Sequence, residues 1–230
     1  PEAIRRIEAE AASCQSAAAA ARVYAVALTS SSLSDNDRAV AEARREHWIK
    51  LADEGRRRVG REWLNDQERE AKEKEADRFI EQSFEMLRLG NGSLAEDHLK
   101  EASRRYLESG RADMLLGLIY AMVVGDNRRA AAHFKEVIDR EPGNAYAYNN
   151  FAITALAARK YSVAIRYFRR ALELMPDSQE LSDNLAVTLG LVGAGQLILP
   201  EKDLEEVSNL YRFAIHDLGL QPYQPPSQGG

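Results

Sequence analysis

The most constraining feature of the chain is an internal repeat. Residues 110–144 and 145–178 carry the same pattern of small, aromatic and proline residues, offset by 34 positions. The offset is 35 for Leu116 and Phe151, which indicates one extra residue between the two helices of the first copy. A period of this length is typical of stacked helical hairpins, whose combined surface is suited to holding another polypeptide. The pairs offset by 34 are Ala130 and Ala164, Phe134 and Phe168, and Pro142 and Pro176.

The repeated positions resemble the tetratricopeptide repeat family. In that family, bulky, large apolar, small and aromatic residues mark the first helix of a hairpin. A small residue, an aromatic, another small residue and a proline mark the second helix. Residues 145–178 depart from the pattern at Ala155, where the family has an aromatic. The matching residues of this copy are Tyr148, Phe151, Ala152, Ala164, Phe168, Ala171 and Pro176. Those of the preceding copy are Leu116, Gly117, Tyr120, Ala130, Phe134, Val137 and Pro142.

This resemblance implies an all-α fold, a right-handed solenoid of about four helical hairpins over residues 76–218. Small residues let two helices approach closely, aromatics fill the space between hairpins, and prolines end the second helices. The expected copies are residues 76–109, a weak match, then 110–144, 145–178 and 179–218, the last irregular and capping, with a late second helix. We predict that residues 219–230, rich in Pro, Gln and Gly, are disordered.

The first 75 residues follow a different pattern, which predicts a helical hairpin or coiled coil. A seam with alternating spacings of three and four predicts one alanine-rich helix over 2–29. A long charged helix is expected over 36–75, with its basic block at residues 56–61 ion-paired and solvated. Two interpretations stay open: the hairpin extends the solenoid, or it forms a homo-oligomer. The seam residues are Ile4, Ile7, Ala11, Cys14, Ala18, Ala21, Ala25 and Leu28.

Composition and scattered polar residues argue against several classes of function. The net charge of −5 disfavours general nucleic-acid binding. No apolar run is long enough to span a membrane, and the balance of charged residues is that of a soluble helical protein, with cytoplasm and periplasm both open. The lone Cys14 fits the seam better than a nucleophile. We therefore predict no catalytic residue, metal site or cofactor. The histidines, His47, His98, His133 and His216, have no metal-ligand spacing.

Candidate binding residues come from the resemblance, which implies that the first helix of each hairpin lines a concave groove. Asn150 and Asn184 occupy equivalent positions one repeat apart. An amide offers both a donor and an acceptor, so this pair could bind a peptide backbone of any sequence. The predicted groove residues are Met114, Leu118, Met122, Tyr146, Asn149, Asn150, Ile153, Leu156 and Asn184, and Val187 lies at a further inward position.

These observations predict a non-catalytic protein–protein interaction module that binds a peptide or helix in the groove and organises an assembly. The alternative is a structural subunit that uses its outer faces and N-terminal hairpin for permanent contacts. A carboxylate clamp of the co-chaperone kind is disfavoured, because Met114, Leu118 and Glu180 stand where cations and an asparagine are needed. An accessory domain of an enzyme is less favoured too. The expected partner is a protein or peptide, with no nucleic acid and no membrane span.

Overall fold

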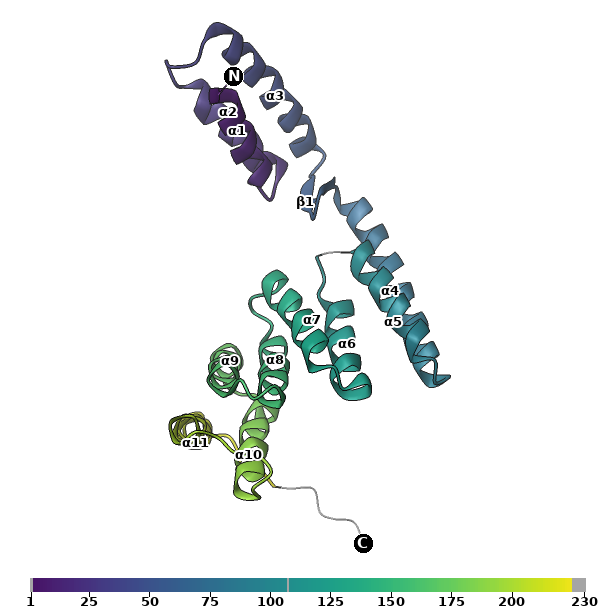
Figure 1. Cartoon of the computed structure of the whole chain (residues 1–230). Coiled ribbons are helices and arrows are strands. Elements are labelled where there is room, and N and C mark those ends of the chain that lie inside the picture. The colour runs from purple at the N-terminus through teal and green to yellow at the C-terminus, as the bar shows by residue number, and fades with distance from the viewer. Residues whose placement is uncertain (1, 107, 225–230) are drawn as a thin grey trace. The chain divides into compact units, whose positions relative to one another are not determined.

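The computed structural model describes residues 2–106 and 108–224 (Figure 1). Contacts between Cα atoms divide the chain into two units. The first comprises Pro1–Leu89 and Glu101–Glu108, and the second comprises Gly90–Lys100 and Ser109–Gly230. Each unit has a buried core of its own.

Three helices form the core of the first unit: α1 (Glu2–Ser13), α2 (Ala17–Leu28) and α3 (Asp35–Asp53). The prediction of one helix over residues 2–29 is therefore wrong. Ser16 has extended backbone and its Oγ accepts a hydrogen bond from the Ala19 N–H, so it begins a new helix as an N-cap. The seam changes register there, and Ala18 is exposed whereas Ala20 is buried. The buried residues of this core are Ile4, Ala11, Ala20, Tyr24 and Ala41.

A β-hairpin interrupts the charged segment, so the predicted helix over 36–75 is also wrong. Strands β1 (Arg57–Val59) and β2 (Glu62–Leu64) pair antiparallel, with Gly60 in the turn at φ 60°. Helix α4 (Asp66–Arg88) then begins at a capping box, in which the Asn65 side chain and the Glu68 carboxylate each bond to the other residue's backbone N–H. These local signals outweigh the helix-favouring charge pattern.

The two breaks in the predicted helices lie against each other. The linker between α1 and α2 lies against β1: the Gln15 carbonyl accepts from the Arg58 N–H at 2.9 Å, and the Ala17 N–H donates to the Arg56 carbonyl at 3.2 Å. Backbone groups released by both helix breaks thus satisfy one another. The basic block is ion-paired at Arg56, whose guanidinium contacts Glu54 and Glu68 at 2.5 and 2.8 Å.

The second unit is an all-α helical repeat, as the sequence predicted. Helices pack in consecutive pairs, and the first of each pair lies beside the second of the pair before it (Figure 1). Helix α5 (Gly92–Arg105) passes from the second unit into the first. The pairs are α6 (Arg111–Ile119) with α7 (Asn127–Arg140), α8 (Ala145–Ala157) with α9 (Tyr161–Leu174), and α10 (Gln179–Gly193) with α11 (Glu201–His216).

The signature residues form the contacts within the pairs. Phe134 and Phe168 are both buried, on α7 and α9 respectively. A Cβ atom added at Gly117 would lie 2.4 Å from Cε1 of Phe134, so the phenyl ring occupies the space that any side chain would need. Glycine at this position lets α6 and α7 approach closely.

The extra residue of the first copy appears as a π-helical turn. Residues Tyr120–Val124 form this turn (η1) directly after α6, and Gly125 follows in the left-handed region at φ 75°. A π turn accommodates one additional residue without breaking the helix. It leaves Met122 79 % exposed, whereas Tyr120 at its start remains buried.

The last pair is irregular, because residues 194–200 form a long connection between α10 and α11. The start of the tail differs from the expected disorder. Leu220 N–H donates to the Ala214 carbonyl, and Gln221 exchanges two hydrogen bonds with the Gln179 side chain. The rest of the predicted disordered segment, residues 225–230, lies outside the described residues.

A pair of leucine substitutions tests the corrected N-terminal packing. Ala20→Leu should destabilise the protein by about 1–3 kcal/mol, because the site is completely buried and has no room for three more carbons. Ala18→Leu should change stability by less than about 0.5 kcal/mol, because the side chain is exposed. Thermal unfolding followed by circular dichroism measures both changes in stability. A larger loss for Ala18→Leu than for Ala20→Leu would support the single continuous helix over residues 2–29 instead.

The repeat core is tested by Phe168→Ala. Removing this buried ring should cost about 3–5 kcal/mol, because a cavity remains between α8 and α9. Phe213→Ala on α11 is the matched control, since that ring is about half exposed, and it should cost much less. Urea titration gives both values. Equal losses would show that Phe168 is not a core residue.

Candidate protein-binding face

Two rows of side chains cross the first helices α6, α8 and α10, and we call them together the first-helix face. One row is polar and is joined by hydrogen bonds. The other is apolar and lies one helical turn further along each helix. The polar row comprises Met114, Asn149, Asn150 and Asn184, and the apolar row comprises Leu118, Ile153 and Val187.

The polar row is a chain of three amides that ends at the thioether of Met114. Asn184 Nδ2 donates to Asn149 Oδ1 at 3.1 Å, which joins α10 to α8. Asn149 Nδ2 donates to Asn150 Oδ1 at 3.3 Å, and Asn150 Nδ2 contacts the Met114 sulfur on α6 at 3.5 Å. Asn150 and Asn184 are thus linked through Asn149, which hydrogen-bonds to both of them. The row fixes three successive first helices relative to one another.

The predicted exposure of Asn149 is wrong. Its side chain is 1 % exposed, so it cannot contact a ligand directly. Helix α8 directs Asn149, its fifth residue, toward α10, and it leaves Asn150, its sixth residue, half-buried at the surface. Asn150 and Asn184 keep some exposure, and no hydrogen bond to Asn184 Oδ1 is found within residues 2–106 and 108–224. An acceptor is thus available beside the buried link.

The apolar row is partly open to solvent. Ile153 and Val187, which are equivalent by the repeat, are 41 % and 40 % exposed. Leu118 is half-buried on α6. Large apolar side chains at repeated exposed positions form an ordered apolar strip rather than scattered surface residues.

The remaining predicted residues flank these rows. Tyr146 is exposed at the start of α8, and Leu156 is half-buried near its end. Met122 is the most exposed of the set because it lies on the π turn. Exposed Leu191, four residues after Val187, was not predicted, although the i,i+4 spacing on one helix face would have indicated it. The exposed Val123 could not be predicted without the π turn.

In residues 2–106 and 108–224, no three His, Cys, Asp or Glu side chains gather in a way that could hold a metal ion. None of the described helices combines the length and apolar character needed to cross a lipid bilayer.

The buried amide link gives a testable order of stabilities. Asn149→Ala leaves Asn184 Nδ2 and Asn150 Oδ1 without their partner, and should cost about 1–3 kcal/mol. Asn209→Ala, at an exposed position on α11, serves as the control and should change stability by less than about 0.5 kcal/mol. Chemical denaturation measures both. A loss at Asn149 no larger than the control would show that the amide row has no structural role.

No protein-family model matches the chain, and no curated protein matches it either. Several solved structures are similar. A crystal structure of the MamA protein is 15 % identical, with a TM-score of 0.49, over 66 % of this chain and 79 % of that one. The Sgt2 TPR domain from Aspergillus fumigatus is 13 % identical, with a TM-score of 0.44, over 68 % and 91 %. The first TPR of Spaghetti, bound to an HSP90 peptide, is 14 % identical, with a TM-score of 0.46, over 60 % and 94 %. The helical hairpins of this chain are consistent with the tetratricopeptide repeat, and the likeness concerns the fold.

Proposed function

We propose that the chain is a non-catalytic protein–protein interaction module whose first-helix face binds a segment of a partner protein. The observation that carries the proposal is the exposed apolar row beside the amide row, repeated with the period of the fold. Apolar side chains lie open to solvent at equivalent positions of successive helices. Covering them with a partner removes apolar surface from water and so stabilises the complex.

The chemistry of the face favours a peptide or a helix as the ligand. Ile153 and Val187 supply apolar contacts, and Asn184 Oδ1 supplies an acceptor next to them. A mostly apolar surface with few polar groups suits an amphipathic helix or an extended apolar segment. The flexible thioether of Met122 would let the rim of the face adapt to more than one side chain.

The face is poorly suited to holding a free carboxylate. Glu180 is exposed at the start of α10, where it would repel an anion, and Met114 is occupied by its contact with Asn150. We therefore do not propose that this chain binds the HSP90 peptide that is bound to the Spaghetti domain.

Site-specific crosslinking tests the proposal. A photoreactive phenylalanine at position 187 should crosslink a partner in extracts of the native source, and mass spectrometry would identify the segment bound. The same group at position 26 is the control, because Val26 is also exposed but lies on α2. Crosslinks from position 26 but not 187 would favour the structural-subunit alternative.

Charge substitution then tests the energetics with the identified segment. Ile153→Asp with Val187→Asp should weaken its binding about a hundredfold or more, because two carboxylates would be desolvated in an apolar contact. Fluorescence anisotropy with a synthetic peptide measures the affinity. Both sites are about 40 % exposed, so the melting temperature should change little. Val26→Asp controls for added negative charge, and an unchanged affinity in the double variant would contradict the proposal.

A further inference from the structure

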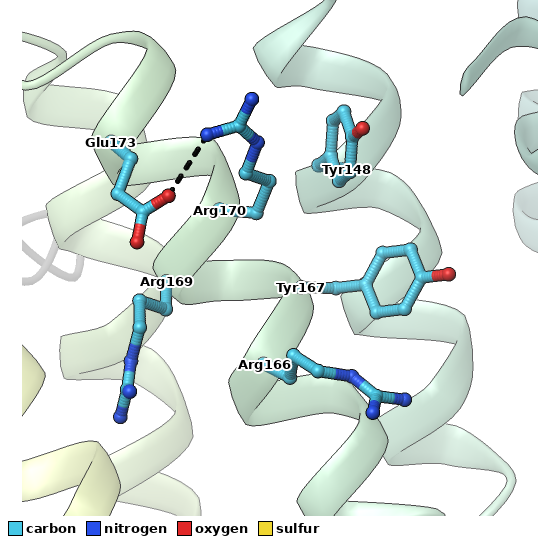
Figure 2. Close-up of a pocket in the computed structure, with 6 residues that line it drawn as sticks. All are labelled: Tyr148, Arg166, Tyr167, Arg169, Arg170 and Glu173. Carbon is cyan, nitrogen blue, oxygen red and sulfur yellow. Dashed lines mark hydrogen bonds and ion pairs between the residues drawn. The ribbon is translucent and has the colours of Figure 1, made fainter. Parts of the chain in front are cut away.

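A second surface with different chemistry lies on the α8–α9 pair. It is a pocket of about 360 Å³, shown in Figure 2, that shares no residue with the first-helix face. Most of its lining comes from α9, and one residue comes from α8. The lining residues are Tyr148, Arg166, Tyr167, Arg169, Arg170 and Glu173.

Two tyrosine rings form the apolar wall of this pocket. The ring centroids of Tyr148 and Tyr167 are 5.7 Å apart, at 35° to each other. Tyr167 is stacked on Phe151, with centroids 4.3 Å apart and an interplanar angle of 28°. Phe151 and both tyrosines also pack against the apolar core residues Val137 and Ile138 of α7. The wall is therefore held in place before any ligand arrives.

Three arginines also line the pocket, and they differ in their ion-pair partners. Arg170 pairs with Glu173 at 3.0 Å, and the pKa of Arg170 is raised first by that hydrogen bond and then by the one to Tyr148. Arg169 pairs with Glu206 of α11. For Arg166, no ion-pair partner is found in the part of the chain that the structure describes. Its guanidinium carbon lies 5.9 Å from the centroid of the Tyr167 ring.

We propose that this pocket binds an acidic side chain of a protein partner, together with an apolar or aromatic side chain next to it. The carboxylate would pair with Arg166 in the two-pronged geometry that a guanidinium offers, and the neighbouring side chain would lie on Tyr148 and Tyr167. The proposal goes beyond the function proposed above, since it assigns a second binding surface on other residues.

Size and charge favour a peptide over other anions. The volume lies near the lower limit for ligand pockets and suits one or two side chains. The carboxylates of Glu173 and Glu206 balance Arg170 and Arg169, which leaves a single uncompensated cation. A nucleic acid or polyphosphate needs several such cations, so one acidic residue matches this pocket better.

The probe is an acetylated and amidated heptapeptide with a central phenylalanine flanked by two aspartates, compared with the same peptide carrying lysines instead. Titration into the ¹⁵N-labelled full chain should shift the amide signals of Tyr148, Arg166 and Tyr167 in a saturable way with the aspartate peptide only. The affinity should fall as salt is added. Absence of these shifts, or equal shifts with the lysine peptide, would overturn the proposal.

Variants separate this pocket from a general charge effect. Arg166→Gln should weaken binding of the aspartate peptide about tenfold, and Arg166→Glu should transfer the preference to the lysine peptide. Arg128→Gln is the matched control, because Arg128 is an exposed arginine on α7 outside the pocket. The Ile153→Asp, Val187→Asp variant should bind the peptide with unchanged affinity. A negative result for the first-helix face would therefore not affect the test of this pocket. An unchanged affinity in Arg166→Gln, or the same signal shifts with a twelve-nucleotide single-stranded DNA at physiological salt, would overturn the assignment.

Discussion

The close contact between Gly117 and the ring of Phe134 is the constraint on which the repeat unit depends. Because a Cβ atom at position 117 would meet that ring at 2.4 Å, α6 and α7 can pack at this distance only over a glycine. The next pair has a buried alanine at the equivalent position, with Ala152 and Phe168 both within the core. Between hairpins, Val137 and Ile138 of α7 pack in one buried cluster with Ala147 of α8. Every later helix is positioned by this sequence of contacts.

The same packing determines which side chains can take part in binding. First helices lie near enough for Asn184, Asn149, Asn150 and Met114 to touch in a row. Both polar groups of the buried Asn149 side chain are hydrogen-bonded within this row. Asn150 and Asn184 stay partly exposed, where a partner could contact them. The apolar row of Ile153 and Val187 stays open one turn away. The stabilising amide row and the proposed binding row thus lie on adjacent turns of the same helices.

The two proposed surfaces differ in the physical basis of their selectivity. On the first-helix face, burial of apolar area would supply the affinity, and a small number of polar groups would orient the ligand. In the α8–α9 pocket, one uncompensated guanidinium beside a fixed aromatic wall would select charge. A partner that engaged both would gain from multivalency, since the second contact would form at high effective concentration.

The sequence by itself determined the repeat, because residues such as Phe134 and Phe168 are needed at each helix contact and recur with the period of the fold. It also indicated one extra residue before Ala130, but only the structure showed that a π turn accommodates it. Local capping at Ser16 and Asn65 and the turn at Gly60 were readable, but periodic charge and apolar patterns had suggested longer helices. Only the tertiary structure decided that Asn149 is buried while Asn150 is not, since a helix rotation of one residue reverses which amide faces the neighbouring helix. The α8–α9 pocket likewise exists only after folding, because Tyr148 and Arg166 come from different helices and have no sequence pattern that joins them.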